Sequence, residues 1–176
     1  MRRLLTVAFP RLDDADAAFI DGFRAEHDAT TRARIDAHVT LVFGCAAVPE
    51  PAYVAHVRQV GERTAPIAFR CRYAMLGADD EAERAYVFLV PDEGHAALSL
   101  LHDHLYTGAL ADHLRLDLPY TPHITIGSSP DRRHAKGLCD GLNAGGLDMR
   151  ATIDALSVGS IEGGRFSVLA TLPLAR

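Results

Sequence analysis

The chain has 176 residues, of which 48% are hydrophobic and 23% are charged, a composition typical of a globular domain with a buried core. Its formal net charge of −5 at pH 7 argues against a broad basic surface for long nucleic acid. The apolar run "LLTVAF" near the start is too short for a membrane span or a signal sequence. We therefore expect a cytoplasmic protein, and we expect it to be a monomer.

The first half of the chain alternates between strand-like and helix-like patterns. The predicted order is a strand over 3–8, a helix over 12–28, a strand over 37–43, a helix over 49–63 and a strand over 66–76. In the first of these helices Leu12, Ala15, Phe19 and Phe23 recur at helical spacing, which predicts that they face the core.

The second half of the chain repeats this order. The predicted elements are a strand over 84–90, a helix over 92–108, a strand over 123–127, a helix over 129–142, and strands over 151–160 and 164–174 joined by the turn "IEGG". The 92–108 helix is expected to turn Leu98, Leu101 and Leu105 inward. Ser129 is the expected N-cap of the 129–142 helix, with Pro130 at its first position.

A tetrapeptide motif, His-x-Thr-apolar, occurs once in each half. "HVTL" begins at His38, and "HITI" begins 85 positions later at His123. The same shift superposes the neighbouring predicted strands, which indicates an internal repeat. We predict an α+β fold over residues 1–176, a single bilobal domain. Its two pseudo-symmetric lobes (approximately 1–80 and 84–176) consist of antiparallel sheet and flanking helices around a central cleft.

Each motif is predicted to place a histidine and a threonine on one face of a strand. Residues two apart in a strand point the same way, so His38 and Thr40 share a face, as do His123 and Thr125. If the two faces meet in the cleft, one imidazole can act as base and the other as acid. The two hydroxyls can hold the oxygens of a phosphate. This set of groups suits displacement at a phosphodiester without a metal or other cofactor.

These motifs resemble those of the 2H phosphoesterases, which include the 2′-5′ RNA ligase-like proteins. The resemblance also extends to "MRRLLTVAFPRLD", "YTPHITIG" and "GRFSVLATLPL". It implies a bilobal fold in which His38 and His123 are the catalytic acid and base and Thr40 and Thr125 bind phosphate. The implied substrates are 2′,3′-cyclic phosphates and related nucleotide or RNA phosphodiesters, and no metal takes part.

The chain departs from the family pattern beside both motifs. Ala37 stands where many members have Pro, and Gly127 and Ser128 follow the second motif where many members have Arg. Arg132 or Arg133 could supply the missing charge from the following helix, although a solvated helix face is the simpler interpretation. Together with Ser128, they are candidate substrate-binding residues.

Several other residues have a binding interpretation and a structural one. Tyr120 could stack on a base or sugar or pack against its own lobe. Four histidines, at positions 95, 102, 104 and 113, suggest a metal site, but no two of them are spaced i, i+4 on a helix, so we predict no metal site. Cys45, Cys71 and Cys139 form no C-x-x-C pair, which argues against a disulfide framework or a zinc knuckle.

The sequence thus predicts a hydrolase that opens the 2′,3′-cyclic phosphate of a nucleotide or short RNA end. We provisionally assign His123 as the base and His38 as the acid. Two alternatives stay open. The same cleft could run in reverse as a 2′-5′ RNA ligase, or the protein could be a nucleotide or RNA-end binding module with little turnover. A repeat that only builds a core is a third and weaker interpretation.

Overall fold

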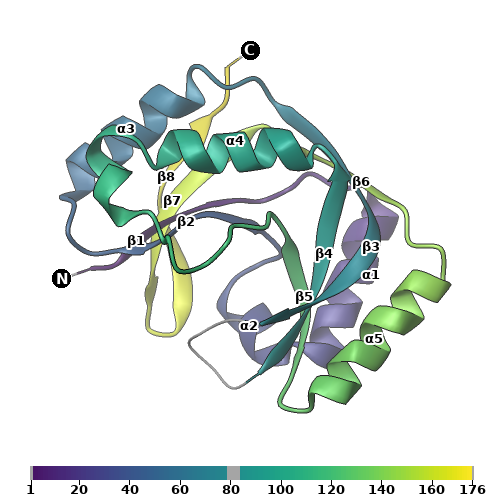
Figure 1. The fold of residues 1–176 in the computed structure, drawn as a ribbon. Coiled ribbons are helices and arrows are strands. Elements are labelled where there is room, and N and C mark those ends of the chain that lie inside the picture. Colours follow the sequence, from purple (N-terminus) through teal and green to yellow (C-terminus); the bar gives the residue numbers. More distant parts are fainter. Residues whose placement is uncertain (1, 79–83, 176) are drawn as a thin grey trace.

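A computed structural model describes residues 2–78 and 84–175 of the chain. Mixed helices and a curled antiparallel sheet form an α+β fold, so the predicted class is confirmed (Figure 1). The strands are β1 (Leu4–Ala8), β2 (Val39–Cys45), β3 (Ile67–Ala78), β4 (Ala85–Glu93), β5 (Ile124–Ser129), β6 (Met149–Ile153), β7 (Ala155–Glu162) and β8 (Arg165–Pro173). The helices are α1 (Asp14–His27), α2 (Ala29–Arg34), α3 (Glu50–Gly61), α4 (His95–Leu105) and α5 (Arg132–Ala144), with a 3₁₀ helix η1 (Gly108–His113).

The sheet consists of two four-stranded halves that meet at the motif strands. Its order is β6-β3-β4-β5-β2-β1-β7-β8, and β2 and β5 share one paired position, Val39 with Ile124. Each half takes strands from both halves of the sequence, because β3 pairs with β4 and β7 pairs with β1. The motif strands are therefore central, and the division into repeats of approximately 1–80 and 84–176 stays a prediction.

The helices α1, α3, α4 and α5 contribute residues to the core on the buried face of the sheet, opposite the motif histidines and threonines. α1 and α5 contact the half that contains β5, α3 contacts β7 and β8, and α4 contacts β2 and β4, an arrangement visible in Figure 1. One continuous core lies beneath them and includes Val39, Leu41, Ile124 and Ile126 from the motif strands. Burial of these apolar residues fixes which face of each strand turns outward.

Local structure departs from the sequence-based expectations in three places. In α1 the buried residues are Ile20 and Arg24, whereas Phe19 is 42% exposed, because the helix turns a different face to β5. The N-cap of α5 is Asp131, whose carboxylate accepts from the Arg133 backbone N–H, so the assignment of Ser129 as N-cap was wrong. Ser129 instead ends β5 and accepts from the Asp131 N–H at 3.0 Å.

The third departure lies near the C-terminus. The predicted strand over 151–160 is divided into β6 and β7. These strands occupy opposite halves of the sheet, since β6 pairs with β3 and β7 pairs with β1. The turn between β7 and β8 has positive φ at Gly163 and Gly164, as a two-residue hairpin turn requires, so the hairpin prediction is confirmed.

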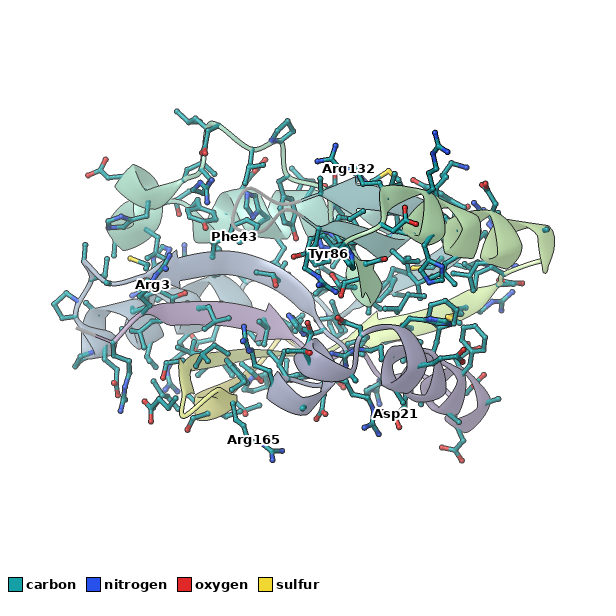
Figure 2. The ribbon with its side chains drawn as sticks, turned by 90° about the horizontal axis from the view of Figure 1, so that it is seen from below. Arg3, Asp21, Phe43, Tyr86, Arg132 and Arg165 are labelled. Atoms are coloured by element: carbon teal, nitrogen blue, oxygen red, sulfur yellow. The ribbon has the colours of Figure 1, made fainter. Side chains whose placement is uncertain are left out.

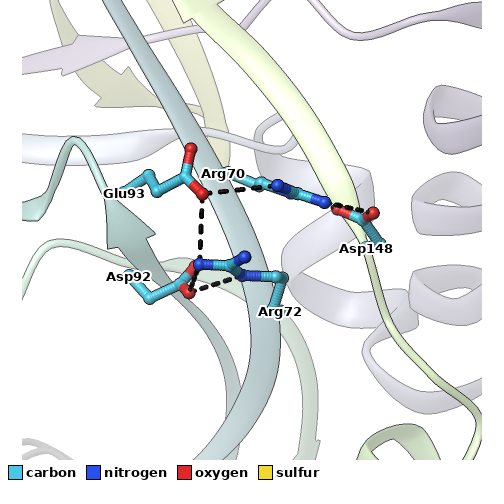
Figure 3. A network of polar contacts seen from close by, with 5 residues as sticks. All are labelled: Arg70, Arg72, Asp92, Glu93 and Asp148. Atoms are coloured by element: carbon cyan, nitrogen blue, oxygen red, sulfur yellow. Dashed lines mark hydrogen bonds and ion pairs between the residues drawn. The ribbon is translucent and has the colours of Figure 1, made fainter.

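A network of ion pairs joins β3, β4 and the segment that leads into β6 (Figure 3). Arg70 contacts both carboxylate oxygens of Asp148, at 2.5 and 2.6 Å, and lies 3.3 Å from Glu93. Arg72 contacts Asp92 at 2.5 Å and Glu93 at 3.1 Å. Bidentate arginine–carboxylate pairs add geometric specificity, so this network helps to fix the register at the outer edge of the β5 half.

Candidate active site

The junction between β2 and β5 brings the four motif residues together. Val39 lies opposite Ile124 in an antiparallel pair. Continuing this register by one residue each way places His38 opposite Thr125 and Thr40 opposite His123. Side chains directly opposite each other in such a pair have Cβ atoms about 5 Å apart. All four motif side chains are partly exposed, and the alternating apolar residues are buried, so the four polar groups share the outward face.

A β-bulge follows the threonine in both motifs. Val7 and Thr6 on β1 pair with Thr40 and Val42, which leaves Leu41 as an extra residue on β2. Phe88 and Val87 on β4 pair with Thr125 and Gly127, which leaves Ile126 as an extra residue on β5. Bulges re-aim neighbouring side chains and are frequent beside active sites. Their equivalent positions give the two motifs the same backbone distortion.

The two histidines are held in the same way. Nδ1 of His38 lies 2.7 Å from the Asp36 carbonyl, and Nδ1 of His123 lies 2.7 Å from the Thr121 carbonyl. A carbonyl can only accept, so each Nδ1 carries the proton and donates it. In the neutral ring Nε2 then has its lone pair available, on the side of the ring away from the anchoring carbonyl. Each motif therefore presents an imidazole with a fixed tautomer.

Both imidazoles favour the neutral form in the ligand-free protein. The pKa of His38 is lowered to about 4, mainly by desolvation and in smaller part by the charges of Arg24 and His123, while the hydrogen bond to the Asp36 carbonyl acts in the opposite direction. Desolvation also lowers the pKa of His123, while its hydrogen bond to the Thr121 carbonyl acts in the opposite direction. The electrostatic effect of His123 on His38 agrees with their placement in one site. A bound anion would raise both pKa values and favour protonation of one ring.

Aromatic side chains flank the two histidines. The Phe88 ring stacks on His123 with a centroid distance of 3.7 Å, and the Phe9 ring meets His38 edge-on at 6.3 Å. A Cβ at position 77 would lie 2.0 Å from the Phe88 ring, so Gly77 on β3 is required for this ring position. These contacts restrict ring rotation and contribute to the desolvation of the imidazoles.

Three aromatic side chains bind the part of β2 that β5 leaves unpaired. The Tyr120 hydroxyl donates to the Thr40 carbonyl at 2.9 Å, and His102 Nδ1 donates to the Leu41 carbonyl at 2.9 Å. The Tyr106 hydroxyl accepts from the Phe43 N–H at 2.9 Å. The rings of Tyr120 and His102 stack at 3.6 Å and are nearly parallel. Buried backbone groups need such partners, so these side chains fix the backbone of the first motif.

The side chains of Tyr120 and Ser128 both form hydrogen bonds within the protein. Tyr120, a candidate substrate-binding residue, directs its hydroxyl at the protein backbone. The Ser128 hydroxyl donates to buried Asp28 at 2.9 Å and accepts from Arg84 at 3.0 Å, which ties β5 to the end of α1. Burial raises the pKa of Asp28. A role in substrate binding stays a prediction for both residues.

The remaining candidates lie in the first turn of α5. Arg132 and Arg133 are both exposed, and Figure 2 shows Arg132 at the edge of the molecule in that view. A role in binding stays a prediction for them as well. His102, one of the four histidines considered for a metal site, is 3% exposed. His102 lies four residues after Leu98 and three before Leu105, on the inward face of α4, so helical periodicity was the signal that could have identified it as buried.

Arg24 lies close enough to the site to affect His38, and the sequence-based prediction did not include it. Its side chain is 2% exposed, and its guanidinium donates to the Ile35 carbonyl at 2.7 Å. Its charge is among the groups that lower the pKa of His38. Its only sequence signal was a charged residue one position after Phe23 in an amphipathic helix, which more often indicates a solvated side chain.

The part of the chain that the structure describes, residues 2–78 and 84–175, offers neither a metal site nor a membrane-spanning helix. No group of three or more His, Cys, Asp or Glu side chains there is placed to hold a metal ion. No helix in the same part of the chain is long and apolar enough to cross a membrane. All three cysteines are buried as free thiols.

The fold and the twin motifs define an α+β protein of the 2H phosphoesterase class. Residues 12–165 match the 2′-5′ RNA ligase superfamily. The chain therefore belongs to that superfamily, and the resemblance found in the motifs is confirmed. A search of curated proteins found no match.

Solved structures show the same fold at low sequence identity. A crystal structure of a phosphoesterase is 17% identical, with a TM-score of 0.58 and 100% of both chains covered. Escherichia coli LigT complexed with 3′-AMP is 17% identical, with a TM-score of 0.55 over 99% of this chain and 98% of LigT. Kluyveromyces marxianus Usb1 is 15% identical, with a TM-score of 0.56 over 98% of each chain. Other structures contain LigT with ATP and Usb1 with uridine monophosphate.

Proposed function

We propose that this protein is a metal-independent phosphodiesterase that hydrolyses the 2′,3′-cyclic phosphate of a nucleotide or a short RNA end. One observation carries the proposal. The Val39–Ile124 pair joins the two motif strands, and its register, continued by one residue each way, pairs His38 with Thr125 and Thr40 with His123. Both imidazoles are anchored through Nδ1 at 2.7 Å. Two equivalent proton-transfer groups and two hydroxyls then surround one position, which suits the displacement of one oxygen by another at phosphorus.

In the proposed reaction, water attacks phosphorus while one ribose oxygen leaves. The neutral histidine takes a proton from the attacking water through Nε2 as the new P–O bond forms. The protonated histidine gives its Nε2 proton to the departing ribose oxygen as the old P–O bond breaks. Thr40 and Thr125 donate hydrogen bonds to the two non-bridging oxygens. The product is a phosphomonoester, and exchange with solvent restores the starting protonation states.

The surroundings of the two rings favour a particular division of roles. Arg24 is among the charges that lower the pKa of His38, and a nearby positive charge disfavours the protonated form of an imidazole. This argues for His38 as the base and His123 as the acid, the reverse of the provisional assignment from sequence. A substrate whose leaving group needs no proton tests this assignment, because only the base is then required.

Related structures support a nucleotide substrate. LigT is found with 3′-AMP and Usb1 with uridine monophosphate, and both share the fold of this chain. The superfamily description also supports a second candidate function. If a ribose 5′-hydroxyl attacked the cyclic phosphate in place of water, the same ring opening would join two RNA ends through a 2′-5′ bond. The new bond would form at the 5′ oxygen, and the bond to the 3′ oxygen would break as that oxygen takes a proton from the acid histidine.

The central test is an assay of the purified protein on the four 2′,3′-cyclic nucleotides, with and without EDTA. We expect turnover that survives EDTA. Turnover abolished by EDTA and restored by a divalent metal would contradict the metal-independent mechanism. Tight binding of the nucleotides without turnover would instead favour a binding module.

The pH dependence gives a second test. Catalysis needs one charged and one neutral histidine, so both pH–rate profiles should be bell-shaped. The pKa of each histidine in the free protein lies below its ordinary value of 6.5, so the kcat/KM optimum should lie below pH 6.5. The kcat optimum should lie at higher pH, because the bound phosphate anion raises both pKa values. A flat kcat/KM profile from pH 5 to 9 would contradict acid–base catalysis by these residues.

A further inference from the structure

A large pocket opens beside the first motif. Its volume is about 850 Å³, within the range of small-molecule sites. Thr40 lies in its wall, and apolar side chains from three adjoining strands line it, namely Leu5, Phe43 and Ile161. The pocket therefore begins at a residue proposed to hold the reacting phosphate and extends over β1 and β7, away from β5.

Arginine side chains contribute charge to this pocket, but most of it is neutralised locally. Arg2 pairs with Glu162 at 2.7 Å and with Glu50 at 3.2 Å. Arg115 pairs with Asp117 at 2.6 Å. Arg3 differs, because its guanidinium donates to the Gly44 carbonyl at 3.3 Å. Within residues 2–78 and 84–175, no carboxylate lies within ion-pair distance of Arg3.

The backbone is shaped to hold the Arg3 guanidinium in this position. A Cβ at Gly44 would lie 3.1 Å from Arg3 Nε and 3.4 Å from its Cζ and Nη2. Gly44 has no positive φ, so the strand conformation does not require glycine there. The absent side chain instead leaves room for the guanidinium to lie over the strand. Figure 2 shows Arg3 and Phe43 toward the same end of the molecule, with Tyr86 farther along.

We propose that this pocket binds a nucleotide unit next to the reacting phosphodiester, and that Arg3 contacts a second phosphate group carried by that unit. The proposal rests on the proposed function for the position of the reacting phosphate at Thr40. A guanidinium without a carboxylate partner, fixed against the backbone, is suited to a phosphate oxygen pair. The apolar lining from Leu5, Phe43 and Ile161 can cover the nucleoside. Substrates with a second phosphate would then be preferred to cyclic mononucleotides.

Binding measurements test the pocket without requiring turnover. The probes are adenosine 3′-monophosphate and adenosine 3′,5′-bisphosphate, measured by isothermal titration calorimetry. We expect the bisphosphate to bind the unmodified protein about 10-fold more tightly, as for a charge-assisted hydrogen bond. Arg3→Met should abolish this preference and leave binding of the monophosphate unchanged. Equal binding of both probes to the unmodified protein would overturn the proposal.

Two further variants separate a direct contact from a general effect. Arg58→Met removes the same charge from an exposed position on α3 and should retain the preference. Gly44→Ala should reduce it, because the added methyl group displaces the Arg3 guanidinium. Loss of affinity for both probes to the same extent in Arg3→Met would overturn the subsite, since Arg3 would then act on the motif phosphate or on the fold.

Turnover of longer substrates distinguishes the side from which the second phosphate comes. The pocket could hold the strand that carries the cyclic phosphate. In that case a dinucleotide ending in a 2′,3′-cyclic phosphate should have a higher kcat/KM than the cyclic mononucleotide, and Arg3→Met should remove the difference. A preference seen only with a 5′-hydroxyl acceptor dinucleotide in ligation would place the acceptor strand there. Absence of turnover with every cyclic phosphate would reject the proposed function, while the binding comparison would still decide on the pocket.

Discussion

The two motif strands are alike in their backbone and different in their surroundings. Each anchors a histidine through Nδ1 to the carbonyl two residues earlier, and each has a bulge directly after its threonine. The strand β2, however, adjoins the large pocket and is bound by side chains from outside the sheet. The histidine of β5 stacks on Phe88, and the end of this strand is joined to the end of α1 by the hydrogen bond from Ser128 to Asp28.

This contrast separates reaction chemistry from recognition. Proton transfer at phosphorus needs two equivalent groups on opposite sides of one atom, which a twofold repeat of one motif supplies. Recognition of a substrate with two different ends needs unequal surroundings. We therefore expect the β2 half to determine which phosphodiester is bound, while both halves contribute equally to the chemical step.

The largest expected effect tests the equivalence of the histidines. His38→Ala and His123→Ala should each lower kcat/KM for a 2′,3′-cyclic nucleotide by about 10³-fold, as for loss of a general acid or base. The double variant should be little worse than either single variant, because both groups act in the same step. The measurement is initial-rate kinetics, with circular dichroism spectra to show that each variant is folded.

A substrate with a p-nitrophenyl leaving group can distinguish the acid histidine from the base histidine. Such a leaving group departs without a proton, so the variant that lacks the acid should keep most of its activity on it. We expect His123→Ala to recover and His38→Ala to stay inactive. The reverse result would restore the provisional assignment of His123 as base, and recovery of neither variant would argue against separate acid and base roles.

Substitution of the motif threonines, Thr40 and Thr125, should have an effect of intermediate size. Thr40→Val and Thr125→Val each remove one hydroxyl at nearly constant volume. Loss of a hydrogen bond to a charged group should lower kcat/KM by about 10- to 100-fold. For a cyclic mononucleotide the two losses should be similar. Thr171→Val, at an exposed position on β8, is the control, and unchanged kinetics in either motif variant would remove that hydroxyl from the phosphate site.

The smallest expected effect concerns the support of β2 alone. Tyr120→Phe removes the hydrogen bond to the Thr40 carbonyl and keeps the stack on His102. The free energy of unfolding should fall by about 1 kcal/mol, and kcat should fall several-fold because the first motif is held less firmly. Tyr73→Phe, at a position 39% exposed, should change neither quantity in urea unfolding and kinetic assays. Equal effects of the two variants would show that Tyr120 does not position the motif.

The sequence by itself determined the local part of this structure. Alternation of apolar and polar residues assigned His38 and Thr40 to one face and Val39 and Leu41 to the other, because side chains in any strand alternate. Helical spacing likewise placed Leu98, Leu101 and Leu105 in the core, which the burial of these residues in α4 confirms. The repeated motif also indicated the superfamily to which the chain belongs.

Only the tertiary structure decided which distant segments meet. Several features depend on two segments at once. They are the pairing of β3 with β4 and of β7 with β1, the bulges at Leu41 and Ile126, and the hydrogen bond from Tyr120 to the Thr40 carbonyl. Periodicity records the preference of one segment and carries no information about its partner. For the same reason Arg3 could be recognised only once the fold had brought it over Gly44, 41 positions along the chain.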